Sequence, residues 1–229
     1  MSFQDSFRQN FIVQDRWKLL LGGLQNTLTI TLFALMLGLV LGLVIAVVRV
    51  TYDTTGKLRI PNMFTKVYVT VIRGTPVILQ LMIIYYIVFS SVNINKVLAA
   101  ILGFGINSAA YVSEIFRAGI MSIDTGQMEA GRSLGLSYGQ AMWRIIMPQA
   151  IKNVLPAVGN ELITLLKETS VSGFIAVQDL ARSADIIRSR TYAPFFPLMG
   201  AAAIYLTLVM ILQACFGRLE RRLAKSDRR

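Results

Sequence analysis

The chain has 229 residues, of which 55% are hydrophobic and 15% charged, and its mean hydropathy is +0.59. Soluble domains carry about 25% charged residues, so these values indicate a protein with several membrane spans and exclude a disordered chain. The net charge is +11, histidine is absent, and Cys215 is the single cysteine. An intrachain disulfide is therefore excluded, and zinc or haem sites of the usual His/Cys type are not expected.

The N-terminal segment, 1–18, mixes acidic and basic residues before the first apolar run. A cleaved signal peptide has a short basic region directly before its apolar core, so we expect the chain to be inserted by its own first span. A span needs about 20 apolar residues. The first is predicted at 19–48, because no charged residue lies between Lys18 and Arg49.

Three further spans follow from uncharged or nearly uncharged runs, at 67–91, 97–120 and 197–217. In the first of these, Arg73, Gly74 and Pro76 predict a bend near the membrane edge. Proline breaks the helical hydrogen-bond ladder, and an arginine there can reach the headgroups.

The segment 150–171 is ambiguous, because Lys152, Pro156 and Glu161 interrupt it. Counting it as a fourth span places fourteen Lys and Arg residues on the side of the C-terminus and seven on the other. Such an excess marks the cytoplasm. We therefore predict an all-α integral membrane protein with one transmembrane domain over 1–229 and five spans. The N-terminus lies outside, and the loop 121–148 and the tail 218–229 are cytoplasmic; topology mainly accounts for the basic charge, so nucleic acid is not an expected partner.

The loop 121–148 is long and mixed in character. Gly135 would cost about 1 kcal/mol inside a helix relative to alanine, which favours a turn or the close approach of another backbone. The following Ala141, Met142, Ile145 and Ile146 form an apolar face at helical spacing. From these features alone, the loop is either an interfacial helix resting on lipid headgroups or a docking element for a protein partner.

Residues 129–148 resemble the EAA loop of the membrane subunits of bacterial ABC importers. That pattern is Glu-Ala-Ala, three residues, Gly, nine residues, then Ile-x-Leu-Pro. Here it reads Glu129-Ala130-Gly131, then Gly135, then Ile145-Ile146-Met147-Pro148, with both spacings intact. Gly131 replaces the second alanine and Met147 replaces the leucine.

Three other stretches resemble one branch of that family, the permeases for polar amino acids such as histidine, arginine, glutamine and glutamate. They are RGTPVILQL at 73–81, SAAYVSEIFRAGI at 108–120 and GNELITLLKETSVSGFIAVQDL at 159–180. With the loop, the resemblance covers nearly the whole chain from the first predicted span to Leu180.

The resemblance implies the transmembrane domain of a type I ABC importer in a bacterial inner (plasma) membrane. Two permease chains, identical or related, would pair; two ATPase subunits would dock on the EAA loops, and an extracytoplasmic binding protein would deliver a polar amino acid, basic ones included. The chain itself would hold no cofactor and no catalytic or metal-binding residue, since ATP and Mg²⁺ belong to the ATPase. Consistently, its single Gly-Lys pair, Gly56-Lys57, lacks the rest of a phosphate-binding P-loop.

The residues expected to couple the chain to the ATPase follow from the same resemblance. They are Glu129, Ala130, Gly131, Gly135, Leu136, Ile145 and Pro148.

Polar side chains within the spans are candidates for a substrate pathway, because a charged or amide group that faces lipid costs several kcal/mol. Asn160, Glu161 and Thr164 lie near the middle of the fourth span and could bind an ammonium or guanidinium group. Equally, Glu161 could form a structural pair with Lys167 or Arg73.

Five more polar residues have two possible roles. Asn107, Ser108 and Tyr111 either line the pathway or bond to a neighbouring helix, while Thr75 and Gln80 either face the pathway or satisfy the backbone freed by Pro76. Glu114 and Arg117, three residues apart near a helix end, are expected either to form a salt bridge there or to place an acid at the headgroups.

Two rivals to the importer remain at this stage. One is a secondary transporter or channel that needs no ATPase, although the chain has no internal repeat of the kind that many secondary transporters show. The other is a membrane scaffold that uses the loop for protein docking without transport.

Overall fold

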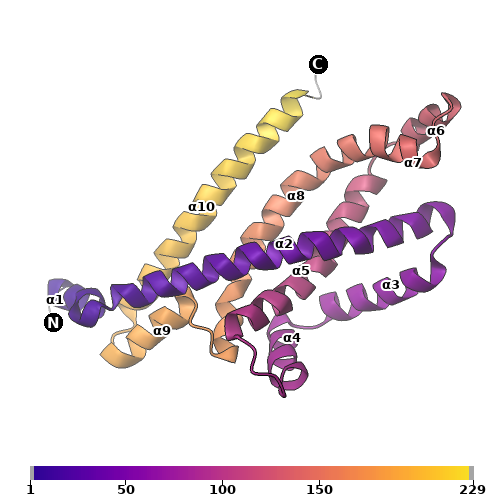
Figure 1. The fold of residues 1–229 in the computed structure, drawn as a ribbon. Helices are drawn as coiled ribbons and strands as arrows, with labels where there is room; N and C mark the ends of the chain where they lie inside the picture. The colour runs from indigo at the N-terminus through magenta and orange to yellow at the C-terminus, as the bar shows by residue number, and fades with distance from the viewer. Residues whose placement is uncertain (1–2, 227–229) are drawn as a thin grey trace.

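The structure, a computed structural model, describes residues 3–226, and this part of the chain is built of helices joined by short connections (Figure 1). Residues 227–229 of the predicted tail lie outside the described part. The α-helices are α1 (Phe3–Phe7), α2 (Trp17–Thr55), α3 (Arg59–Gly74), α4 (Val77–Ile83), α5 (Lys96–Met121), α6 (Thr125–Ser133), α7 (Tyr138–Ala141), α8 (Met147–Glu168), α9 (Leu180–Thr191) and α10 (Phe195–Ser226). Short π- and 3₁₀-helical segments extend several of them: η1 (Arg8–Ile12), η2 (Val13–Asp15), η3 (Ile84–Val88), η4 (Met142–Ile146) and η5 (Thr169–Ile175).

The longest helix, α2, runs the length of the molecule from one end to the other (Figure 1). One end carries α1 and α9, and the other carries α6, α7 and the C-terminal part of α10. With 39 residues, α2 continues past the predicted span at 19–48 to Thr55. It stops at Gly56, whose left-handed backbone (φ 69°) is the usual glycine end of a helix.

Among the described residues, three helices are long and apolar enough to cross a membrane, namely α2, α5 and α10. A fourth span is added if α3 and the α4–η3 segment count as one, although they are bent by 111°. The polar residues of α8 keep it below the same criterion of length and composition. Because α8 packs against both α5 and α10, it belongs to the same bundle, and the five-span count stays a prediction.

The bend between α3 and α4 falls inside the segment predicted as the second span. Thr75 and Pro76 have extended backbones there, so the helical ladder is interrupted at the predicted proline. The amide of Gln80 compensates, because its Nε2 donates to the carbonyl oxygens of Ile72 (2.7 Å) and Thr75 (3.0 Å) and to the Thr75 hydroxyl (2.7 Å). The bend that Arg73, Gly74 and Pro76 predict is thus present, and these hydrogen bonds hold it.

The closest helix pair is α2 and α5, and glycine makes this approach possible. A Cβ atom on Gly38 would lie 2.9 Å from both Cβ and Oγ of Ser108, and one on Gly42 would lie 2.6 Å from Cγ1 of Val112. From the other side, a Cβ on Gly105 would lie 2.6 Å from the side chain of Leu37. Small residues let helix backbones approach, and dispersion contacts and interhelical bonds then hold them together in a bilayer.

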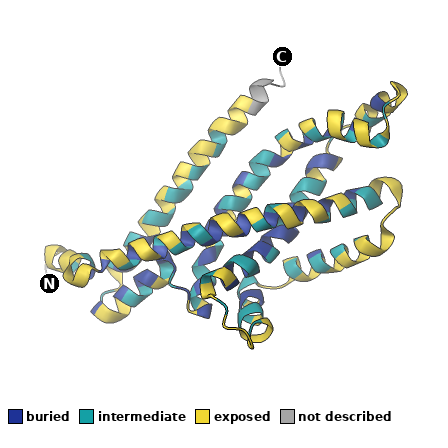
Figure 2. Ribbon diagram, viewed as in Figure 1, coloured by how far each residue is buried: buried dark blue, intermediate teal, exposed yellow. Residues whose placement is uncertain are grey.

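Burial is concentrated along this α2–α5 seam (Figure 2). The largest buried cluster joins α2, α4, α5, α8 and the segment before α9; its members are Ile30, Ala34, Leu35, Leu81, Ala99, Ala100, Phe104, Leu165, Ile175 and Val177. In the most apolar stretch of α5, 61% of the residues are buried within the chain, against 11% in α10. Hence α5 is the central helix and α10 a peripheral one.

We predict that Gly38→Ala destabilises the protein by about 1–3 kcal/mol, the usual cost of overpacking a tight interface. The new methyl group would force α2 and α5 apart at Ser108. Gly22→Ala is the matched control on the same helix, because a Cβ there meets nothing within 4 Å. Thermal unfolding in detergent should show a lower transition temperature for Gly38→Ala alone. Equal transition temperatures in the two variants would contradict the conclusion that close packing at Gly38 stabilises the protein.

Candidate functional site

The loop at 121–148 folds as two short helices joined by a glycine turn. Asp124 begins α6 by accepting a hydrogen bond from the Gly126 amide (2.8 Å). Gly135 ends it with a left-handed backbone (φ 85°), and the Leu136 amide then donates to the Gly131 carbonyl (3.2 Å). This pairing is typical of a glycine helix terminus, so Gly135 has the turn role that the sequence predicted.

The second helix of the loop, α7, is fixed at its start by reciprocal hydrogen bonds. The Ser137 hydroxyl accepts from the Gln140 amide (3.3 Å), and the Gln140 side chain accepts from the Ser137 amide (2.8 Å). This is a capping box, a signal present in the sequence as Ser-x-x-Gln but not used in the prediction. It holds Tyr138 at the first position of α7.

Gly131 is buried where α6 meets the following helices. A Cβ on it would lie 2.7 Å from Cδ1 of Ile145 and 3.3 Å from Cβ of Ala141. Glycine therefore lets α6 lie directly on α7 and η4. This packing accounts for the departure from the second alanine of the EAA pattern, and it makes Ile145 and the half-buried Leu136 internal supports of the loop.

The apolar face at Ala141, Met142, Ile145 and Ile146 corrects one expectation. The sequence allows this face to contact lipid headgroups or a partner. In the structure it packs inside the chain, against a cluster formed by Val50 of α2, Ile120 of α5, Ile146 and Ala150. Helical periodicity shows that a face is apolar and not what covers it. The surface left for a partner must come from other residues.

Two other large apolar side chains of this loop are left exposed. Leu134 is 84% exposed and Trp143 is 71% exposed, and neither was among the predicted coupling residues. Of those that were, Glu129, Ala130, Gly135 and Pro148 are exposed. Glu129 also lines a hollow of about 350 Å³ beneath the loop, with Arg132, Tyr138 and Met142 among the other lining residues.

A second group of predicted residues meets in the middle of the bundle. The Ser108 hydroxyl on α5 donates to Oε1 of Glu161 on α8 (2.7 Å). Among the described residues, Glu161 forms no ion pair, and in particular none with Lys167 or Arg73. Its neighbours Asn160 and Thr164 are exposed and lie one turn apart on one face of α8.

The remaining pathway candidates have structural partners. Asn107 donates from Nδ2 to Oε1 of Gln80 (2.9 Å), which joins α5 to the bend, and Gln80 in turn holds Thr75. Tyr111 lies beneath the guanidinium group of Arg73, 5.3 Å from the ring centroid. These four residues therefore make interhelical and backbone contacts that the sequence allowed, and their place on a substrate pathway stays a prediction.

The predicted Glu114–Arg117 pair is present and belongs to a larger network. Arg117 contacts Glu114 and also Asp53 of α2, both at 3.3 Å, and Glu114 pairs with Arg49 of α2. All four side chains are partly buried, with 15–34% exposure. Alternating charges thus fasten the last turns of α2 to α5.

The opposite end of the molecule contains α9, a helix that lies between the predicted fourth and fifth spans. Asp179 begins α9 by accepting from the Arg182 amide (2.6 Å), and its other oxygen accepts from the Ser172 hydroxyl (3.2 Å). Here α2 supplies Thr27, whose hydroxyl accepts from the Leu180 amide (3.1 Å), and Asn26, which donates to the Gln178 carbonyl (2.9 Å). An aspartate before an apolar residue is a helix-start signal and could have revealed α9.

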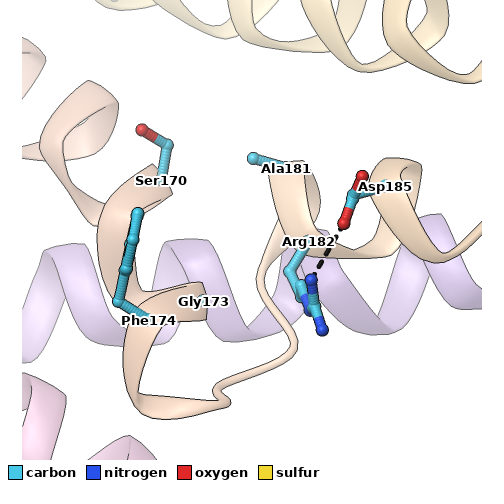
Figure 3. Close-up of a pocket in the computed structure, with 6 residues that line it drawn as sticks. All are labelled: Ser170, Gly173, Phe174, Ala181, Arg182 and Asp185. Carbon is cyan, nitrogen blue, oxygen red and sulfur yellow. Dashed lines mark hydrogen bonds and ion pairs between the residues drawn. The ribbon is translucent and has the colours of Figure 1, made fainter.

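An open pocket of about 330 Å³ lies between η5 and α9 at this end (Figure 3). Its lining residues are Ser170, Gly173, Phe174, Ala181, Arg182 and Asp185. The two charged residues pair with each other at 2.8 Å. The pocket therefore presents an aromatic ring and a neutralised ion pair to whatever approaches this end.

Comparison with known proteins agrees with the family that the sequence motifs resemble. Residues 38–225 match the model of the family "Binding-protein-dependent transport system inner membrane component". The chain is 45% identical over 162 residues to the arginine transport system permease protein ArtQ of Bacillus subtilis (strain 168), covering 70% of this chain and 74% of the relative. It is 34% identical over 216 residues to the L-cystine transport system permease protein TcyB of the same organism, covering 93% and 90%. A solved amino acid ABC transporter with histidines superposes with a TM-score of 0.82 at 40% identity, covering 93% of this chain and 98% of that one.

The Asp179 carboxyl, which lies between the predicted fourth and fifth spans, makes stability depend on pH. Burial raises its pKa from 3.8 to about 6, so the folded state binds this proton more tightly than the unfolded state. The resulting stability is fully present below about pH 4 and is lost as the pH rises through about 6, a change on the order of 2–3 kcal/mol. Asp179→Asn keeps the helix cap and removes the titration, so the difference between its unfolding temperature and that of the wild type should grow from pH 4 to pH 7. If the unfolding temperatures of the two proteins changed with pH in parallel, the raised pKa of Asp179 would be contradicted.

Proposed function

Because the chain belongs to the family of inner membrane components of binding-protein-dependent transport systems, we propose that its two ends serve different partners during import. The protein is the permease subunit of an amino acid ABC importer and has no ATPase site of its own. ATP and Mg²⁺ are bound by a separate ATPase, which closes and opens beneath the membrane domain.

The observation that carries the proposal is the exposed apolar surface on the 121–148 loop. Leu134 and Trp143 are among the most exposed large apolar side chains of the described residues, although the face beside them is packed into the chain. Leaving such groups in water is unfavourable by about 1.5–3 kcal/mol each relative to burial. We assign them to a groove on the ATPase, with Glu129, Ala130, Gly135 and Pro148 around them and with Gly131, Leu136 and Ile145 as internal supports.

This assignment sets the orientation. The loop and the C-terminal part of α10 lie at one end of the bundle (Figure 1), and we place that end in the cytoplasm, as the Lys/Arg asymmetry predicts. The N-terminus and α9 then face outward in a bacterial inner membrane. The binding protein would dock at this outer end, near the pocket between η5 and α9, and a second permease chain would complete the transmembrane pathway.

The substrate route is proposed to pass Glu161. Every amino acid carries an ammonium group, and the Glu161 carboxylate has a hydroxyl partner but no cation partner among the described residues. A carboxylate within a span is costly unless a partner or water meets it. Asn160 and Thr164 lie beside it with exposed polar groups, while Asn107, Tyr111, Thr75 and Gln80 support the surrounding helices.

Leu134→Asp should abolish co-purification of the ATPase subunit with the tagged chain, because a carboxylate would be buried in an apolar groove. Glu129→Lys should weaken co-purification and lower uptake by about tenfold, the usual cost of a lost charged hydrogen bond. Glu220→Lys is the matched control, since it reverses an exposed charge on α10 at the same end. Pull-down from detergent extracts followed by uptake assays in liposomes measures both effects.

If both loop variants retained the ATPase and full uptake, the docking assignment would fail. Uptake that continues without ATP and collapses with an ion gradient would instead indicate a secondary transporter.

Glu161→Gln should reduce uptake of amino acids by about tenfold or more, because a neutral amide replaces the charged acceptor of the ammonium group. ATPase co-purification should not change. Glu168→Gln, which neutralises an acid at the end of the same helix, is the control and should retain uptake. If Glu161→Gln took up amino acids at the wild-type rate, Glu161 would have a structural role and would not bind the substrate.

A further inference from the structure

The contact between Tyr138 of α7 and Thr54 of α2 connects the 121–148 loop to the longest helix of the protein. The two hydroxyl oxygens lie 3.0 Å apart. The Thr54 hydroxyl already donates its hydrogen to the Val50 carbonyl (2.8 Å). Since a threonine hydroxyl has one hydrogen, Tyr138 must be the donor, and the direction of this bond is fixed.

The surroundings of this contact are loosely packed. A hollow of about 350 Å³ lies on one side and a second of about 210 Å³ on the other, and Tyr138, Met142 and Ile120 line both. Apart from these residues, the link between loop and helix consists of the small cluster around Val50 and Ile146. Methionine contacts adapt easily to displacement, whereas a hydrogen bond is directional. Among the described residues, the hydroxyl pair is the one hydrogen bond between the loop and α2, and so the directional part of their contact.

On α2, the residues next to Thr54 are joined to α5 by ion pairs. Its neighbour Asp53 pairs with Arg117 of α5, and Arg49 one turn earlier pairs with Glu114. Further along α2, the close contacts at Gly38, Gly42 and Gly105 hold it against α5. A displacement applied at Thr54 must move the α2–α5 pair as a unit.

That unit reaches the mid-bundle carboxylate directly. From Thr54, α2 runs without interruption for sixteen residues, roughly 24 Å at 1.5 Å per residue, to Gly38, which packs on Ser108. Ser108 is the residue whose hydroxyl donates to Glu161 of α8 (2.7 Å). The contacts thus form an unbroken series from the loop surface to Glu161.

We propose that Tyr138 and Thr54 are positioning residues that transmit movement of the ATPase-docked loop through α2 and the Gly38–Ser108 contact to Glu161. This inference rests on the proposed function, because it requires the loop to be moved by an ATPase. It adds a specific route to that function. Tyr138 contacts neither the nucleotide nor the transported amino acid, so its loss changes how efficiently hydrolysis is converted into transport.

The test uses the complete transporter, with permease, ATPase and binding protein, reconstituted in liposomes. Uptake of a radiolabelled mixture of L-amino acids and ATP hydrolysis are measured on the same preparation. Tyr138→Phe removes the donor and keeps the ring, and Thr54→Val removes the acceptor. Each should lower the uptake per ATP hydrolysed by about two- to tenfold, the factor that corresponds to one net hydrogen bond, while ATPase co-purification stays at the wild-type level.

Two matched controls are available on α2. Thr55→Val removes a hydroxyl with the same bond to the carbonyl four residues earlier but without contact to the loop, and Tyr52→Phe removes a hydroxyl that has no hydrogen bond among the described residues. Neither should change the ratio. The double variant Tyr138→Phe/Thr54→Val should be no worse than the more severe single variant, because both remove the same bond.

An unchanged ratio in Tyr138→Phe and Thr54→Val, or an equal loss in Thr55→Val, would overturn the proposal. So would additive effects in the double variant, since these would mean two independent structural defects. Failure of the wild-type complex to take up any amino acid with ATP present would count against the proposed function itself and is distinguishable from all of these outcomes.

Discussion

The close approach of α2 and α5 at Gly38, Gly42 and Gly105 is the constraint on which the other features depend. Within a bilayer, burial of apolar surface provides little drive for helices to associate, so stability must come from tight packing and polar contacts. The close approach provides the tight packing, and it places Gly38 of α2 directly on Ser108 of α5. On its other side, Ser108 donates its hydroxyl hydrogen to Glu161 of α8.

Several polar groups within the helices hold elements in place. Gln80 satisfies the backbone carbonyls exposed by the bend and links it to Asn107, which is how an interrupted helix can be tolerated in a membrane domain. The Arg49–Glu114–Arg117–Asp53 network fastens the ends of α2 and α5. Against this background Glu161 is unusual, because its single hydroxyl partner leaves its charge uncompensated within the described residues.

The two ends of the molecule differ in how firmly they are attached. At the α9 end, α2 is bonded to residues 178–180 through Asn26 and Thr27, with Asp179 buried beside them. At the other end, the 121–148 loop rests on α2 through a thin strip between two hollows. The α9 end is thus joined to α2 by hydrogen bonds between buried elements, whereas the 121–148 loop is joined to α2 by the Tyr138–Thr54 hydroxyl pair and an apolar cluster.

Several properties were determined by the sequence itself. Uncharged or nearly uncharged runs predicted α2, α5 and α10, because bilayer thickness fixes the length of an apolar helix, and Gly135 and Pro76 indicated a turn and a break through their own backbone preferences. The tertiary structure decided the rest. Nothing local revealed that the apolar face at 141–146 is covered by Val50 and Ile120, that Glu161 meets Ser108 and not Lys167 or Arg73, or that Tyr138 reaches Thr54. Those partners lie far apart in the chain, and only the packing of whole helices, set by the glycine seam, brings them together.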